Sequence, residues 1–148
     1  MWLIYIFVFF FFALDRITKY YFVLTAKQYS IWPDFLLLEL HKNSNIALSL
    51  PLIDIIYYPL MIIILFCLFY LLVDSYKKHN KYLSTCILFI VAGAMSNLFD
   101  RIRWGGVIDF INVPWWSVFN LADCYIICAV IFWLIYLFNH GKKVSEKN

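Results

Sequence analysis

Four long apolar segments dominate the chain and are separated by more polar connections. They span residues 2–24, 55–73, 83–99 and 121–138. Each is near the roughly 20 residues that a helix needs to cross a bilayer. The second segment contains Pro59 near its start, where a helix tolerates proline. The pattern predicts four membrane-spanning helices.

The three connections differ in character. Residues 25–54 mix turn-forming residues with a short apolar run, which indicates short strands and turns lying on the membrane surface. Residues 74–82 form a short basic loop. Residues 100–120 contain paired glycines and paired tryptophans. They predict a looped segment at the lipid interface, where tryptophan is favoured.

Composition supports a lipid environment. Of 148 residues, 65% are hydrophobic and 14% are charged, and the mean hydropathy is +0.81. Soluble domains are about a quarter charged, so this chain cannot hide its apolar surface from water by folding alone. The net charge of +3 comes with no long basic stripe, which argues against a nucleic-acid partner. We expect one domain, an all-α integral membrane protein with a small, β-rich or looped outer segment.

The distribution of lysine and arginine predicts the orientation. Residues 74–82 and the tail after residue 138 carry six lysines together, whereas the other two connections carry four basic residues. This bias places both termini and the 74–82 loop in the cytoplasm. No basic residue precedes the first apolar run and no small-residue cleavage site follows it, so we expect a membrane helix there and not a cleaved signal peptide.

Ionisable residues in apolar segments are costly, and they mark either function or pairing. Asp15 and Lys19 are four residues apart on one helix face and can neutralise each other. Asp100 directly follows the third apolar segment, at the expected C-terminal end of its helix. A carboxylate there opposes the helix dipole, so it needs Arg16, Lys19 or Arg101 as a partner. The simplest role for these residues is therefore structural.

Asp109 and Asp123 form the constellation best suited to chemistry. Asp109 lies between apolar neighbours, which favours its protonated form. Asp123 lies at the start of the fourth apolar segment, where a helix dipole stabilises a negative charge. Two carboxylates in unequal surroundings can share one proton, so that one activates water while the other donates to a carbonyl. The alternative is that they are two unrelated capping or ion-pairing residues.

Other functions fit the sequence less well. The three histidines and four cysteines follow no metal-ligand spacing. A transporter or proton-relay subunit would space carboxylates through the depth of the bilayer, whereas here they gather at one predicted face. A non-catalytic membrane scaffold would need neither Asp109 nor Asp123.

Five short motifs, in order, resemble the lipoprotein signal peptidase (signal peptidase II) family over about residues 1–140. Residues 15–19 resemble D-x-x-[ST]-K, residues 43–49 resemble N-x-G-A-x-F-S, residues 92–101 resemble G-G-x-x-G-N-x-x-D-R, residues 107–111 resemble V-x-D-F-I, and residues 119–123 resemble F-N-x-A-D. Each motif is weak alone, but the ordered set on a four-span chain is specific.

The chain differs from these motifs at several positions. Ala92 and Ser96 replace glycines, and both remain small enough for close helix packing. Asn45 stands where glycine is usual, and asparagine tolerates a positive φ. Leu48 replaces the usual phenylalanine, and the interval between Asp109 and Asp123 is shorter than is typical.

The resemblance implies an aspartic endopeptidase of the bacterial cytoplasmic membrane. It would cut diacylglyceryl-modified prolipoproteins on the N-terminal side of the lipidated cysteine, at the outer face, using no metal or organic cofactor. Membrane lipid would surround it, and we expect a monomer. Asp109 and Asp123 would be catalytic. The resemblance implies substrate-binding or supporting roles for Asn43, Asn97, Arg101, Asn120, Asp15, Lys19 and Asp100.

Overall fold

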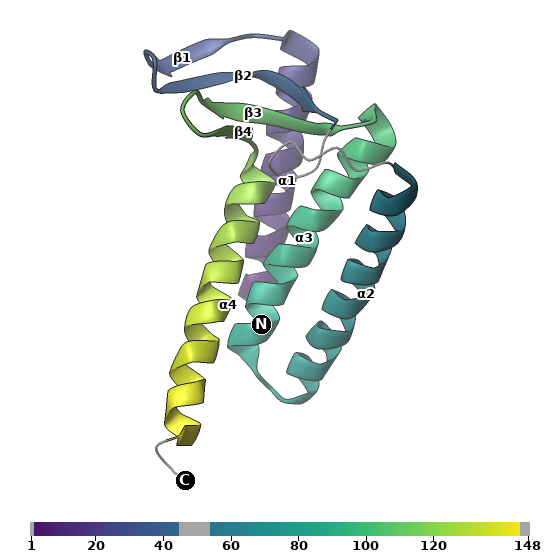
Figure 1. Ribbon diagram of the computed structural model, residues 1–148, viewed down its shortest axis with the longest axis vertical. Helices are drawn as coiled ribbons and strands as arrows, with labels where there is room; N and C mark the ends of the chain where they lie inside the picture. The colour runs from purple at the N-terminus through teal and green to yellow at the C-terminus, as the bar shows by residue number, and fades with distance from the viewer. Residues whose placement is uncertain (1, 45–53, 146–148) are drawn as a thin grey trace.

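The computed structural model describes residues 2–44 and 54–145 of the chain. Within these ranges it contains four helices and a four-stranded sheet (Figure 1). In chain order the elements are α1 (Trp2–Thr25), β1 (Tyr29–Trp32), β2 (Leu36–Asn43), α2 (Asp54–Lys77), α3 (Lys81–Trp104), β3 (Val107–Val113), β4 (Ser117–Phe119) and α4 (Leu121–Ser145).

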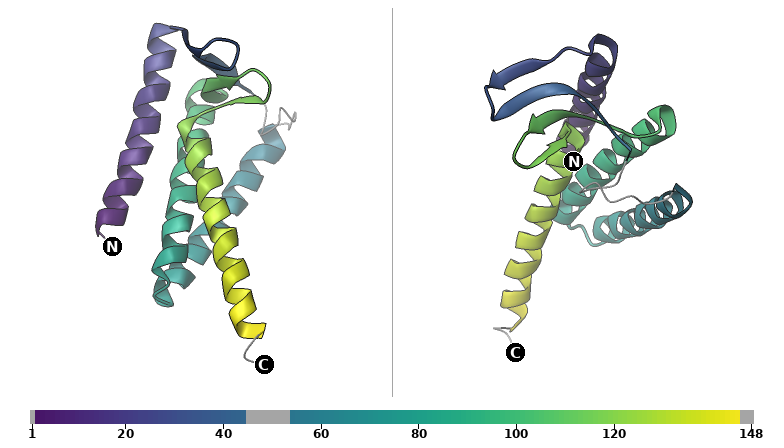
Figure 2. Two further views of the ribbon diagram at one scale, coloured as in Figure 1. Left: turned by 90° about the vertical axis from the view of Figure 1, so that its left-hand side faces the viewer. Right: turned by 45° about the horizontal axis from the view of Figure 1, so that its top comes forward.

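Helix α3 organises the helical part of the molecule, because it contacts each of the other three helices. The buried cluster at its centre joins α2, α3 and α4 through Leu68, Ile87, Ile90 and Ala129. Gly93 brings α3 and α4 together: a Cβ atom there would lie 2.5 Å from the side chain of Ile126. Two turned views show α1 and α2 on different sides of α3 (Figure 2).

The outer surfaces of all four helices carry exposed large apolar side chains. Exposed apolar area on this scale marks contact with a membrane or a partner. In the described part of the chain, three helices are long and apolar enough to cross a membrane, over Ile56–Lys77, Lys81–Trp104 and Leu121–Asn139. Helix α1 has 24 residues but carries three charged ones, so its membrane crossing stays a prediction.

The sheet is antiparallel, with the order β1-β2-β3-β4, and it lies across one end of the helices (Figure 1). Its central pair joins two distant segments, with His41 opposite Asp109 and Asn43 opposite Val107. Phe22 of α1 stacks on Phe110 of β3 with ring centroids 5.0 Å apart, which fixes the sheet to the bundle. The described ends of the chain and the α2–α3 turn lie at the opposite end (Figure 1).

The structure changes several predicted boundaries. The helices extend beyond the predicted apolar runs, so the expected loop at residues 74–82 shrinks to a turn between Lys77 and Lys81. The expected looped segment at 100–120 is instead the end of α3 followed by β3 and β4. Strands expected within residues 25–54 are confirmed as β1 and β2. The expected turn at Asn45 lies outside the described residues.

Candidate active site

The first turn of α4 holds Asp123 in a reciprocal pair of hydrogen bonds with Asn120. The Asn120 side-chain oxygen accepts from the backbone N–H of Asp123 at 3.0 Å, and the Asp123 Oδ2 atom accepts from the backbone N–H of Asn120 at 3.2 Å. This is a capping box, in which two otherwise unpaired N–H groups at a helix start are satisfied. The local sequence that begins α4 therefore also fixes the Asp123 carboxylate.

Asp109 reaches the same asparagine from the sheet. Its neighbours Ile108 and Phe110 are buried, and Asp109 itself is only 2% exposed. The Nδ2 atom of Asn120 donates to Asp109 Oδ1 at 2.7 Å, and Asn43 Nδ2 donates to Asp109 Oδ2 at 3.1 Å. Asn120 thus contacts both aspartates, although β3 and α4 present them from different directions.

The surroundings of Asp109 favour its protonated form. Burial is the largest cause and the nearby charge of Asp123 adds to it, and together they raise the pKa of Asp109 to about 6. Hydrogen bonds from Asn43 and Asn120 and the charge of Lys19 act in the opposite direction but do not cancel the rise. A carboxyl with this pKa can carry a proton beside an ionised neighbour close to neutral pH.

Asn97 of α3 connects the aspartates to a buried lysine. Its Nδ2 atom donates to Asp123 Oδ1 at 2.8 Å, and its Oδ1 atom accepts from Lys19 Nζ at 2.8 Å and from Asn120 Nδ2 at 3.2 Å. Both side-chain groups of Asn97 are therefore engaged. The orientation of its amide is set by one cation on one side and one carboxylate on the other.

Lys19 forms the centre of a buried ionic cluster. Its Nζ atom lies 3.0 Å from Asp15 Oδ2 and 2.9 Å from Asp100 Oδ2, and all three side chains are essentially inaccessible. Arg16 bonds the other oxygen of Asp100 at 2.5 Å. The predicted pair of Asp15 and Lys19 is therefore present, and the partners of Asp100 are Arg16 and Lys19.

This cluster also holds the start of α4. The backbone N–H of Ala122 donates to Asp15 Oδ1 at 2.9 Å, which links α1 to the turn that carries Asp123. Ser96 donates to Asp15 Oδ2 at 2.5 Å and accepts from Arg16 at 3.2 Å. The sequence predicted only close helix packing at Ser96, and not these hydrogen bonds. Its position four residues before Asp100, on the same face of α3, was the available signal.

Arg101 takes a different direction from the other predicted site residues. Its guanidinium lies 4.4 Å from the ring centroid of Tyr57 on α2, in a cation–π contact. It is therefore directed toward α2, and Asp100 is paired elsewhere. The positions of the second motif after Ser44, including Ala47, Leu48 and Ser49, lie outside the described residues. Among the described residues, no group of three or more His, Cys, Asp or Glu side chains is arranged to hold a metal ion.

A protein-family model described as signal peptidase (SPase) II matches residues 7–139 of the chain. A lipoprotein signal peptidase of Enterococcus faecalis is 35% identical over 146 residues, covering 90% of this chain and 86% of the relative. A lipoprotein signal peptidase of Listeria welshimeri is 26% identical over 140 residues, covering 90% of this chain and 91% of the relative.

Two solved structures share the fold. Both carry titles that describe a bacterial membrane enzyme studied by the in meso method. One, at 2.3 Å resolution, has a TM-score of 0.82 and 27% identity, and covers 100% of this chain and 93% of that chain. The other, at 1.9 Å resolution, has a TM-score of 0.77 and 27% identity, and covers 93% of each chain. The agreement extends over the sheet and the helices together.

Proposed function

Because the chain belongs to the signal peptidase II family, we propose that it is a membrane aspartic endopeptidase that removes signal peptides from bacterial prolipoproteins. Its substrate carries a diacylglyceryl group on cysteine, and the cut falls on the N-terminal side of that residue. The observation that carries the proposal is that Asn120 forms hydrogen bonds with both Asp109 and Asp123, combined with a pKa of Asp109 of about 6.

The reaction needs one protonated and one ionised carboxyl. Asp123, which accepts hydrogen bonds on both oxygens, takes a proton from the attacking water. Asp109 donates its proton to the peptide carbonyl oxygen as the new C–O bond forms. The C–N bond of the tetrahedral intermediate then breaks as Asp123 gives the proton it took from water to the leaving amine. The hydroxyl formed from the carbonyl oxygen returns its proton to Asp109 as the carbonyl re-forms. Water supplies all the atoms added to the products.

The remaining residues have supporting roles in this proposal. Asn97 and Asn120 orient the two carboxyls, and Asn43 fixes the outer oxygen of Asp109 or binds substrate backbone. Asp15, Lys19 and Asp100 hold α1, α3 and the start of α4 in register. Arg101 lies beside α2 and contacts the substrate on that side of the site.

The ion pairs of α1 and the distribution of lysines support a membrane arrangement for this proposal. We propose that α1 is the fourth span, because its charged residues Asp15, Arg16 and Lys19 are engaged by ion pairs with Asp100 of α3, by the pair within α1 and by a hydrogen bond from the start of α4, and do not face lipid. Both termini and the α2–α3 turn then lie in the cytoplasm, and the sheet lies at the outer face of the cytoplasmic membrane. A lipidated substrate reaches the site laterally from the bilayer, and one copy of the chain suffices.

The test uses the full-length protein in detergent with a diacylglyceryl-modified prolipoprotein, followed by the gel shift on loss of the signal peptide. Asp109→Asn and Asp123→Asn each keep the size of the side chain and remove a carboxyl. We expect each to lower the cleavage rate at least about 10³-fold, since the reacting groups act as a unit.

Asp34→Asn is the matched control. Asp34 is exposed in the turn between β1 and β2 and has a φ of 59°, which asparagine also tolerates. This variant should cleave at the wild-type rate. Near-normal cleavage by either Asp109→Asn or Asp123→Asn, with an unchanged melting midpoint, would remove that residue from the mechanism and make Asp100 the next candidate.

A further inference from the structure

The end of the bundle opposite the sheet is basic. The short turn between α2 and α3 is surrounded by Lys77, Lys78, His79 and Lys81. Lys78 pairs with Asp74 at 2.7 Å. Lys77 and Lys81 form no ion pair with any residue whose side chain the structure describes. Two exposed cations, one at the end of α2 and one at the start of α3, therefore remain without an ion-pair partner among the described side chains.

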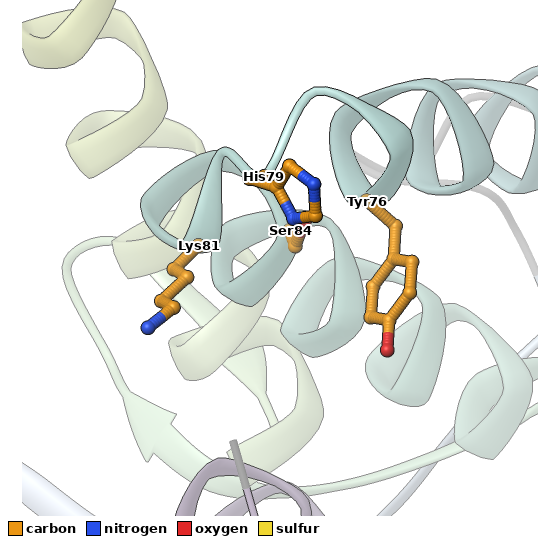
Figure 3. A pocket seen from close by; sticks show the side chains of 4 residues that line it. All are labelled: Tyr76, His79, Lys81 and Ser84. Atoms are coloured by element: carbon orange, nitrogen blue, oxygen red, sulfur yellow. The ribbon is translucent and has the colours of Figure 1, made fainter.

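Two adjoining hollows lie beneath these cations. The first, of about 120 Å³, is lined by Tyr76, His79, Lys81 and Ser84, and Figure 3 shows Tyr76 and Lys81 on either side of Ser84. The second, of about 330 Å³, shares Tyr76 and Ser84 with the first and has Lys77 at its edge. The rest of its lining is Tyr5, Leu72, Val73 and Leu88, from α1, α2 and α3.

Hydrogen bonds between α2 and α3 hold this region in one shape. The hydroxyls of Ser75 and Ser84 lie 2.9 Å apart in the buried interface. Asn80 caps α3 by accepting from the backbone N–H of Leu83, and its Nδ2 atom donates to Tyr136 of α4 at 2.7 Å. The two hollows are thus formed by rigid elements, which lowers the cost of binding a ligand there.

We propose that the two hollows together bind one anionic phospholipid from the leaflet at this end of the bundle. One acyl chain lies in the larger hollow against Leu72, Val73 and Leu88. The phosphate lies at the rim that the two hollows share, with Lys77 on the side of the larger hollow and Lys81 on the side of the smaller one. The gradient from apolar lining to cationic rim matches the gradient from acyl chain to anionic headgroup, and basic pockets between membrane helices bind such lipids on the cytoplasmic side.

This site is separate from the proposed peptidase site. Ser84 lies near the start of α3 (Lys81–Trp104), and Asn97 and Asp100 lie toward its other end. The two sites are therefore at opposite ends of one helix (Figure 1). The lipid would fasten α1 to α2, two helices that share no extensive direct contact. We therefore expect the bound lipid to raise the melting midpoint of the protein without taking part in cleavage.

The test is native mass spectrometry of the full-length protein in detergent with dioleoyl phosphatidylglycerol or dioleoyl phosphatidylcholine added. The wild type should retain one phosphatidylglycerol more strongly than phosphatidylcholine. The double variant Lys77→Gln/Lys81→Gln should bind phosphatidylglycerol about 30-fold more weakly, from two lysines near an anionic group. Lys78→Gln, between them in sequence and already paired with Asp74, should bind like the wild type.

A second variant tests the apolar hollow without changing charge. Val73→Trp should fill it and weaken retention of both lipids, while its gel-shift cleavage rate stays at the wild-type value. Equal retention of the two lipids by wild type, or full retention of phosphatidylglycerol by Lys77→Gln/Lys81→Gln, would overturn the proposal. So would a wild-type dimer that the double variant dissociates, because the hollows would then be an interface between copies.

Discussion

The two ends of the helical bundle handle charge in opposite ways. At the end beneath the sheet, Asp15, Lys19 and Asp100 are buried, and each charged atom has a partner from another helix. At the far end, Lys77 and Lys81 are exposed, and the ion pair of Lys78 with Asp74 lies within one helix and its adjoining turn. The buried charges connect separate elements directly, whereas the exposed charges form no direct link between elements among the described residues.

This difference predicts where mutations cost stability. Removing one partner from a buried ion pair leaves an uncompensated charge, which is far more costly than the pair itself is stabilising. An exposed pair is screened by water and contributes little. Variants at the two ends of the molecule can therefore test whether the buried cluster beneath the sheet positions the proposed site.

The largest effect should come from Lys19→Met. It leaves Asp15 and Asp100 buried with their nearest shared cation gone, which should cost about 3–5 kcal/mol of stability. Thermal unfolding in detergent measures the loss. Adding Asp15→Asn to this variant removes one of the two stranded charges and should recover part of the melting midpoint. An unchanged midpoint for Lys19→Met alone would mean that the cluster does not hold α1, α3 and α4 together.

Asp109 should make stability depend on pH. Its pKa is about 6 in the folded protein and near 3.8 when unfolded, so the folded state holds the proton more tightly. The resulting stabilisation is fully present below pH 3.8 and is lost as the pH rises through about 6, with a full range of about 3 kcal/mol. The melting midpoint of the wild type should therefore fall between pH 4 and pH 7 relative to Asp109→Asn. Parallel curves for the two proteins would contradict the pKa assignment.

Gly106→Ala should impair the site more than the fold. A Cβ atom at Gly106 would lie 2.9 Å from the backbone oxygen of Asn43, so β2 must shift and carry the Asn43 amide away from Asp109. Misplacement on this scale should lower the cleavage rate about 10- to 100-fold. Gly105→Asn is the matched control, because a Cβ atom there meets Lys42 at an ordinary 3.7 Å and asparagine tolerates its φ of 67°. Equal cleavage rates for Gly106→Ala and Gly105→Asn would show that cleavage does not depend on the position of the Asn43 side chain.

The smallest effect should come from Lys78→Gln. It breaks an ion pair that is exposed on one side of a turn, so we expect no measurable change in melting midpoint or in cleavage rate. The same thermal and gel-shift assays apply. A loss of stability comparable to that of Lys19→Met would show that the charges at the two ends of the bundle do not differ in their contribution to stability.

The sequence predicted the helices because apolar runs of about 20 residues have few alternatives in lipid. It missed the helix ends, since Asp74–Lys77 and Arg101–Trp104 contain charged residues yet are helical. It also missed β3, whose residues Val107–Phe110 are all buried and so show no alternation of apolar and polar positions. The paired glycines suggested a loop, whereas Gly105 caps α3 with a positive φ and Gly106 allows close approach of β2.

The contacts within the site were likewise predictable only where they are local in sequence. The bond between Asp15 and Lys19 follows from helical spacing, so it could be derived locally. The contacts of Lys19 with Asp100 and Asn97, and of Asp15 with Ala122, cross between helices and depend on how α1, α3 and α4 pack. The pattern of residues within one segment does not indicate how that segment packs against the others. Motif resemblance supplied the site residues, but not the partners that orient them.

The position of Asn120 has a consequence for biosynthesis. Its side chain joins β3, α3 and the first turn of α4, so the proposed dyad is complete only when the last helix has taken its place. A nascent chain still emerging from the ribosome would carry Asp109 in the sheet without its partner. On the proposed mechanism, the protein therefore becomes able to cleave its substrate only at the end of synthesis. An incomplete product truncated before residue 123 would be inactive in the membrane.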